Sequence, residues 1–300
     1  MLSICIPVYN YDIRALIHQL TAQIDQLTAQ INPQTKKIEI IIIDDGSDEG
    51  YRKLNRSITN YTNVIYKEQI NNGRAKTRNK LAEIANYNNL LFLDCDCEPN
   101  TQFIQNYINK LPYQGVIVGG LKYHDKPKDK SQVLRWKVGI KREQKTVKKR
   151  NKNTYGNFLS SNFVINKEIF NTHKFNLNLQ GYGHEDTLLG IELKKNNIPI
   201  LHLDNPVYHL GIDEIHTYLK KIKQSIKNLK IIKNIEEVES NIKILRVYTL
   251  TKKLYLNTIV CRILKTILPS LERYLLNCGT NLFAWDLYKL GLALIILNKK

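Results

Sequence analysis

The stretch from Asn89 to Pro99 reads NLLFLDCDCEP, and it predicts both a fold and a site. Its first half is almost entirely apolar, as in a strand that is buried on both faces. The strand ends in Asp94-Cys95-Asp96. Alternate residues of an extended chain point the same way, so both carboxylates can face one cation, and oxygen ligands suit Mn²⁺ or Mg²⁺. The alternative is that these carboxylates only cap a helix that begins near Asn100.

The sequence around this stretch repeats one order of strand, loop and helix. Apolar runs predict strands over Leu2–Val8, Ile38–Ile43, Asn63–Lys67 and Gly115–Gly120. Apolar residues that recur every three or four positions predict helices over Tyr11–Ile31, Asn72–Ala85 and Asn100–Leu111. Strands that alternate with helices form a mostly parallel, Rossmann-like sheet flanked by helices, so we expect an α/β fold.

In such sheets ligands bind beyond the carboxyl ends of the strands. Tyr9-Asn10 and Asp44-Asp45 follow two of the predicted strands. A carboxylate at that edge can accept a hydrogen bond from a base N–H or a ribose hydroxyl. The alternative for the segment Asp44 to Ser47 is a simple turn, because Asp, Gly and Ser are all turn formers.

Later in the chain, Glu185-Asp186 opens a predicted helix after two glycines. Adjacent carboxylates can divide two roles, one binding a hydroxyl and the other removing its proton. They also stabilise any first helical turn, which is the alternative. His209 follows a short apolar run and could complete a carboxylate metal site, with His184 and His202 as rival candidates.

The composition limits the classes of partner. Lys and Arg number 45 against 27 Asp and Glu, a net charge of +18 that attracts nucleic acid, an anionic membrane or phosphorylated substrates. The basic residues are scattered and no nucleic-acid motif occurs, so we expect no nucleic-acid partner. Five cysteines without metal spacing indicate free thiols, and packing is the favoured role of Cys95 and Cys97. The start, MLSICIPVYN, lacks a signal peptide, so we expect a cytoplasmic protein that can lie peripherally at the inner membrane face.

The second half of the chain changes character. Lys141 to Lys152 carries seven Lys or Arg against one Glu, which predicts a mobile basic loop. From about Ile215 the pattern is helical and basic, so we expect a catalytic domain over residues 1–212 and a helical C-terminal extension over 213–300. Lys mixed with Leu, Ile and Tyr suits contact with anionic lipid, and packing on the first domain explains the same pattern.

Taken together, the motifs resemble family 2 glycosyltransferases, which are inverting, nucleotide-sugar-dependent enzymes with the GT-A fold. The resemblance covers about the first 210 residues and rests on five ordered stretches, SICIPVYN (3–10), EIIIIDDGS (39–47), NGRAKTRN (72–79), LFLDCDCEP (91–99) and GHED (183–186). One departure is Cys97, where many relatives carry a further Asp after the DxD.

The resemblance implies roles for individual residues. For the nucleotide, it implies contacts with uracil, ribose or phosphates from Pro7, Tyr9, Asp45, Arg78 and Asp94. It implies that Asp96 and His209 bind a divalent metal, Mn²⁺ or Mg²⁺. Asp186 would be the general base and Glu185 would bind an acceptor hydroxyl. Trp136, Phe158 and Asn162 lie between the DxD and Asp186, the region that commonly forms the acceptor pocket in this fold, so the resemblance implies that they contact the acceptor.

The expected reaction is inverting transfer of a sugar from a UDP-sugar to a hydroxyl of a glycan or lipid-linked glycan. Two alternatives stay open. A nucleotidyltransferase would need a glycine-rich phosphate loop after the first strand, where this chain has Pro7-Val8-Tyr9-Asn10. A catalytically silent sugar- or polyanion-binding protein would have lost the carboxylates at Asp94, Asp96 and Asp186, which are present.

Overall fold

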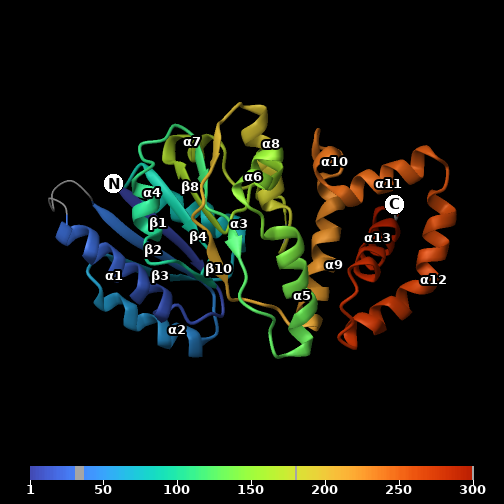
Figure 1. Cartoon of the computed structure of the whole chain (residues 1–300), viewed down its shortest axis with the longest axis horizontal. Helices are drawn as coiled ribbons and strands as arrows, with labels where there is room; N and C mark the ends of the chain where they lie inside the picture. The colour runs from blue at the N-terminus through green and yellow to red at the C-terminus, as the bar shows by residue number, and fades with distance from the viewer. Residues whose placement is uncertain (31–36, 180, 299–300) are drawn as a thin grey trace.

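The computed structural model describes residues 1–30, 37–179 and 181–298; Ile31, the last residue of the first expected helix, lies outside these ranges. A seven-stranded sheet has the order β3-β2-β1-β4-β8-β6-β9, and Figure 1 labels five of its strands, β1 to β4 and β8. Its strands are β1 (Leu2–Val8), β2 (Ile38–Asp45), β3 (Val64–Gln69), β4 (Asn89–Leu93), β6 (Val116–Val118), β8 (Asn162–Asn166) and β9 (Ile200–His202). β8 is antiparallel to β4 and β6, and the other pairs are parallel. The expected α/β class with a mostly parallel sheet is confirmed.

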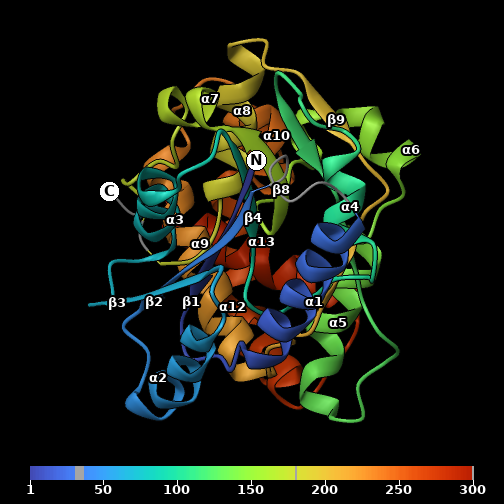
Figure 2. The same cartoon turned by 90° about the vertical axis from the view of Figure 1, so that its left-hand side faces the viewer.

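Helices cover both faces of this sheet because successive strand residues point to opposite sides. Ile4 and Ile6 of β1 belong to one apolar cluster with α1 (Arg14–Gln30) and α4 (Phe103–Ile108). Cys5 of the same strand joins the opposite cluster, with α3 (Arg74–Ile84) and α7 (Lys167–Thr172). Figure 2 shows α3 on one side of the strands and α1 and α4 on the other. Both faces of β1 are therefore covered, as its continuous apolar sequence requires.

A second, three-stranded sheet has the order β5-β10-β7 and brings distant segments together. Its strands are β5 (Cys97–Glu98), β7 (Leu121–Lys122) and β10 (Val207–His209). β10 runs antiparallel to β5, so His209 pairs with Cys97 directly after the DxD. This small sheet therefore places His209 close to the end of β4.

The basic segment Lys141 to Lys152 is helical except at residues 144–146, so the prediction of a mobile loop was wrong. A π-helical turn η3 (Gly139–Glu143), α6 (Val147–Arg150) and a 3₁₀ turn η4 (Asn151–Asn153) follow one another. Thr146 caps α6, and the buried Arg150 donates from Nη2 to the carbonyl of Leu203 at 2.7 Å. A count of local charges could not show these contacts, because the partner of Arg150 lies 53 positions away.

Helices form the C-terminal third of the chain, at the right of Figure 1: α9 (Ile215–Ile232), α10 (Val238–Asn241), α11 (Lys243–Lys253), α12 (Asn257–Leu276) and α13 (Leu282–Asn298). Their apolar cluster includes residues of α5 (Val133–Val138) and α8 (Glu185–Lys195). None of the helices in the described ranges is long and apolar enough to cross a membrane. The remaining short helices are α2 (Glu49–Asn55), η1 (Arg56–Asn60), η2 (Lys130–Gln132) and η5 (Tyr155–Asn157).

Candidate functional site

The carboxyl ends of β1, β2 and β4 lie side by side and carry the polar residues that the sequence singled out. Val8 pairs with Asp44, and β1 lies between β2 and β4. Tyr9 follows β1 with 55% of its surface exposed, so its ring is free to contact a ligand. Pro7 is the penultimate residue of β1. The edge of the sheet thus presents an aromatic ring beside several carboxylates.

The two adjacent carboxylates that end β2 have different partners. Asp44 accepts from the Ser47 N–H at 2.8 Å and from the Tyr66 hydroxyl at 3.1 Å, so it fixes its own loop. Asp45 accepts from the backbone N–H groups of Asn72 at 2.8 Å and Gly73 at 2.9 Å. Asp45 therefore ties the end of β2 to the start of α3, and a carboxylate keeps further acceptor capacity beyond these bonds.

Arg78 joins α3 to the DxD. Its Nη2 donates to Oδ1 of Asp94 at 2.5 Å, and its side chain is only 3% exposed. The Nε and Nη1 atoms of Arg78 are buried and lack a hydrogen-bond partner among the described residues. A buried guanidinium with unused donors is suited to an anionic ligand, because phosphate oxygens can accept from both.

Asp96 and His209 face each other across the small sheet. The Nε2 of His209 lies 3.5 Å from Oδ2 of Asp96. The Nδ1 of His209 is buried without a partner among the described residues. A Cβ built on Gly211 would lie 2.0 Å from the same Asp96 oxygen, so only glycine leaves room for that carboxylate.

This pair fits a divalent metal. Two ligands of one octahedral ion lie about 3 Å apart when each bond is about 2.1 Å long, and oxygen with imidazole nitrogen suits Mn²⁺. Within the described ranges no group of three or more His, Cys, Asp or Glu side chains could hold a metal. His202 bonds to the Thr154 carbonyl at 3.0 Å and His184 to the Ser225 hydroxyl at 3.0 Å, so His209 is the histidine that meets the DxD. Cys97 lies in the apolar core, where burial raises its thiol pKa.

Asp186 is the second residue of α8 and has an unusual pKa. Burial and then the neighbouring charge of Glu185 raise the pKa of Asp186 from 3.8 to about 7, although the Thr187 N–H and Arg78 oppose the shift. Glu185 accepts from the Gly183 N–H at 3.0 Å, which fixes the loop before α8. A carboxyl group with a pKa near 7 can exchange a proton at neutral pH.

A cavity of about 200 Å³ adjoins Asp186. Phe158 lines this cavity, together with Lys145 and Lys194. Trp136 and Asn162 are not among the described residues that line it. The indole N–H of Trp136 donates to the His124 carbonyl at 2.8 Å. Asn162 is buried and accepts from the Tyr107 hydroxyl at 2.6 Å, so it holds the core.

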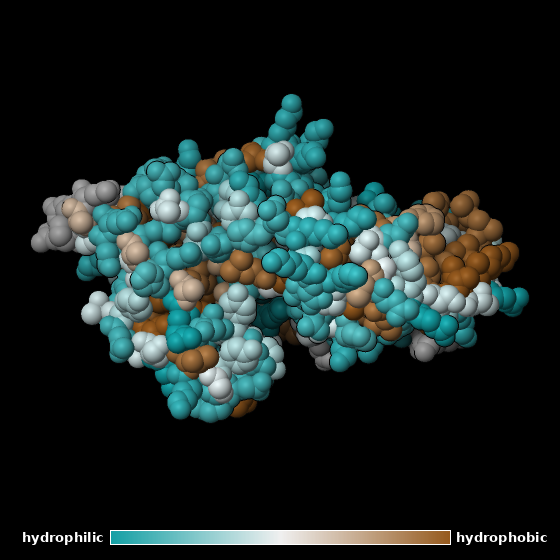
Figure 3. All heavy atoms as spheres, turned by 60° about the horizontal axis from the view of Figure 1, so that its bottom comes forward, coloured by the Kyte–Doolittle hydropathy of each residue, from teal (hydrophilic) through white to brown (hydrophobic). Residues whose placement is uncertain are grey.

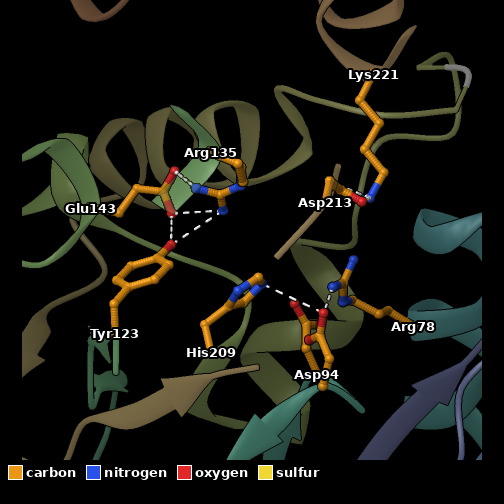
Figure 4. A network of polar contacts seen from close by, with 9 residues as sticks. Arg78, Asp94, Tyr123, Arg135, Glu143, His209, Asp213 and Lys221 are labelled. Atoms are coloured by element: carbon orange, nitrogen blue, oxygen red, sulfur yellow. Dashed lines mark hydrogen bonds and ion pairs between the residues drawn. The ribbon is translucent and has the colours of Figure 1, made fainter. Parts of the chain in front are cut away.

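Two features of the site were missed by the sequence analysis. The first is Arg74. Desolvation lowers the pKa of its guanidinium, but the negative charges of Asp94, Glu185 and Asp96 outweigh that effect, so the pKa is raised. The guanidinium of Arg135 contacts Glu143 at 3.1 Å and the Tyr123 hydroxyl at 3.2 Å, and the Tyr123 ring lies 5.6 Å from that of His209 (Figure 4). Because Arg74 lies inside the NGRAKTRN motif, the sequence could have indicated its place in the site. Arg135, Glu143 and Tyr123 lie in no such motif, so the sequence did not indicate their cluster.

The sequence matches a known protein family. The sequence model of the family "Glycosyl transferase family 2" matches residues 3–173, which is more than half of the chain. The chain belongs to glycosyl transferase family 2. The matched region contains the DxD, Asp45 and Arg78, and it ends before Asp186 and His209.

The curated relatives and solved structures agree with this assignment. The chain is 32% identical over 131 residues to chondroitin synthase of Escherichia coli, covering 42% of this chain and 18% of that protein. It is 31% identical over 123 residues to glycosyltransferase AglE of Haloferax volcanii, covering 39% of this chain and 38% of that protein. The chain thus spans well under half the length of these relatives.

The fold is shared with solved glycosyltransferases. The mannosyltransferase PcManGT from Pyrobaculum calidifontis, in complex with GDP-Man and Mn²⁺, has a TM-score of 0.55 at 14% identity and covers 99% of this chain and 85% of its own. S. aureus TarS 1–349, in complex with UDP, has a TM-score of 0.50 at 17% identity and covers 97% of this chain and 90% of its own. At such identities the likeness shows the GT-A fold alone.

Proposed function

We propose that this protein transfers a sugar from a UDP-sugar to a hydroxyl group of a glycan or lipid-linked glycan, with inversion at the anomeric carbon. One observation carries the proposal. Asp94, Asp96 and His209 converge at the ends of β4 and β10; Arg78 pairs with Asp94 at 2.5 Å, and its charge also acts on the pKa of Asp186 on α8. The groups that we propose to bind the donor and to accept the proton would thus lie in one site.

The donor's nucleotide would lie along the ends of β1, β2 and β4. The exposed Tyr9 ring would stack on the uracil, with Pro7 shaping the base pocket, and Asp45 would accept from the uracil N–H with its remaining lone pairs. Asp94 would bind the ribose hydroxyls, and the unused donors of Arg78 would reach the base or phosphates.

Asp96 and His209 would hold Mn²⁺ or Mg²⁺, with donor phosphate oxygens among the further ligands. The spacing of 3.5 Å between Nε2 of His209 and Oδ2 of Asp96 supports this role. A divalent ion bound there would stabilise the negative charge that grows on the leaving diphosphate. Because Cys97 replaces an Asp that many relatives carry, Asp96 would be the main carboxylate ligand.

Asp186 would act as the general base. In its deprotonated form the carboxylate would take the proton from the acceptor hydroxyl while the oxygen attacks the anomeric carbon from the face opposite the diphosphate. This single displacement inverts the configuration, so an α-linked donor sugar becomes β-linked. Glu185 would bind the acceptor, which would enter through the cavity beside Phe158. Trp136 and Asn162 do not line this cavity, so they would influence the acceptor only indirectly, through the residues that they contact.

The proposal extends to the organisation of the chain. Residues 1–212 would form the catalytic domain and residues 213–300 a helical extension, in a protein of the cytoplasm. The five cysteines form no disulfide within the described residues, which fits a reducing compartment.

The deciding experiment is nucleotide release from a panel of UDP-sugars and GDP-sugars in Mn²⁺, Mg²⁺ or EDTA. We expect metal-dependent release from one UDP-sugar, and its loss in Asp96→Ala. The matched control is Asp25→Ala, which removes an exposed carboxylate on α1. Release only from a GDP-sugar would overturn the uridine assignment, and the absence of both release and nucleotide binding would overturn the transferase.

A further inference from the structure

α12 presents large apolar side chains on its outer side. Ile259, Ile263 and Ile267 follow one another at intervals of four residues and are exposed, Ile259 at 58%. The turn before α12 adds Leu254, Leu256 and Tyr255, the last 92% exposed. We call these six residues the α12 apolar face. Figure 3 shows the resulting hydrophobic area at the end of the molecule formed by α11 and α12.

Among the described residues, this face lies outside the apolar cluster through which α12 packs. α12 packs on the rest of the helical cluster through a different stripe, which includes Val260, Leu264 and Leu275. Leu264 and Leu275 are buried, whereas Ile259 and Ile263 lie about 100° round the helix from Val260 and Leu264 and are exposed. A surface helix ordinarily carries polar residues on its solvent side. A continuous exposed apolar stripe of this kind marks an interaction surface.

The positive charge around the α12 apolar face indicates an anionic partner. From position 243 to 276 the chain holds seven Lys or Arg and one acid, Glu272, a net charge of +6. Arg246, Arg262 and Lys265 form no ion pair within the described residues. A second copy of the chain would place these uncompensated positive charges against one another. An anionic lipid surface supplies both an apolar interior and negative headgroups.

We propose that the α12 apolar face inserts into the interface of an anionic bilayer, with α12 lying along the membrane surface and its flanking cations at the headgroups. The inference does not depend on the transfer reaction. The face belongs to the helical end of the molecule, whereas the sheet that carries the candidate site forms the other end (Figure 1). The protein would therefore be held at the membrane with its donor site facing the aqueous side.

The test is co-sedimentation of the full chain with vesicles of phosphatidylcholine, with and without phosphatidylglycerol. We expect binding to the anionic vesicles, and a loss of at least about ten-fold in Ile259→Ser/Ile263→Ser, because two apolar side chains no longer enter the lipid. Arg262→Gln/Lys265→Gln should lose about five-fold per charge, and only on anionic vesicles. The matched control Leu54→Ser, an exposed leucine on α2, should bind like the wild type.

A second measurement reports insertion directly. In Tyr255→Trp, the indole emission should shift to the blue on anionic vesicles and be quenched by lipids brominated in their acyl chains. Failure of the wild-type chain to bind anionic vesicles would overturn the proposal. So would a concentration-dependent dimer that Ile259→Ser/Ile263→Ser dissolves while vesicle binding stays unchanged, because the face would then belong to a second copy. Nucleotide release in vesicle-free solution tests the transferase separately.

Discussion

At the scale of single residues, Asp186 is the group whose proposed role makes the sharpest prediction. Asp186→Asn should keep donor binding and lose about 10²–10⁴ in kcat, because amide nitrogen and oxygen cannot take the acceptor proton. The base is active when deprotonated, and its pKa is raised to about 7. The kcat of the wild type should therefore rise with pH through about 7 and then level. A pH profile of nucleotide release checks both statements, and an unchanged profile in Asp186→Asn would remove Asp186 from the role.

Arg78 makes a second prediction at this scale. Arg78→Lys keeps a positive charge near Asp94 but removes the buried Nε and Nη1 donors that lack partners. Since arginine binds phosphate through two parallel hydrogen bonds and lysine acts as a point charge, the Kd for UDP should rise about ten-fold. Calorimetric titration with UDP measures this change. Lys53→Ala, an exposed cation on α2, is the control, and equal UDP affinity in both variants would contradict the assignment.

At the scale of elements, the pairing of β10 with β5 places His209 against the DxD, and Gly211 follows two residues later. Gly211→Ala should push the Asp96 carboxylate aside, because the new Cβ would lie 2.0 Å from its Oδ2. We expect the Mn²⁺ concentration for half-maximal nucleotide release to rise about ten-fold, while far-UV circular dichroism stays unchanged. Gly50→Ala on α2 is the matched control, since a Cβ there meets nothing within 4 Å. Unchanged metal dependence would place the metal away from Asp96.

The elements also show what the sequence could and could not predict. β1, β2 and β4 were predicted because strands buried on both faces are continuously apolar, and their ends carried the polar site residues. α4 is shorter than expected, Phe103–Ile108 instead of Asn100–Leu111. β10 has three residues and β5 has two, and more than a hundred positions separate them in the sequence. No local sequence pattern specifies the pairing of strands that are so short and so far apart. The helical basic segment was missed for the same reason, since distant partners order it.

At the scale of the whole molecule, α13 is the centre of the C-terminal cluster. Trp285 is fully buried and stacks on Tyr218 of α9, with ring centroids 4.9 Å apart. Trp285→Ala should lower the free energy of unfolding by about 3–5 kcal/mol, because the cavity left by an indole cannot collapse. Phe283→Ala, two residues earlier on the same helix and 73% exposed, should change it by less than about 0.5 kcal/mol. Chemical denaturation of the two variants gives the comparison, and equal losses would mean that α13 does not pack in this way.

The same cluster predicts how the two proposed parts of the chain depend on each other. It contains Leu134 and Val138 of α5 and Leu188 and Ile191 of α8, all from the first 212 residues. Removal of residues 213–300 would expose these side chains beside the carboxyl group of Asp186. We expect the shortened chain to aggregate or to lose nucleotide release, and the full chain to unfold in one calorimetric transition. A soluble 1–212 fragment with wild-type nucleotide release would instead show that the catalytic domain folds alone, and that α9 to α13 serve the membrane surface only.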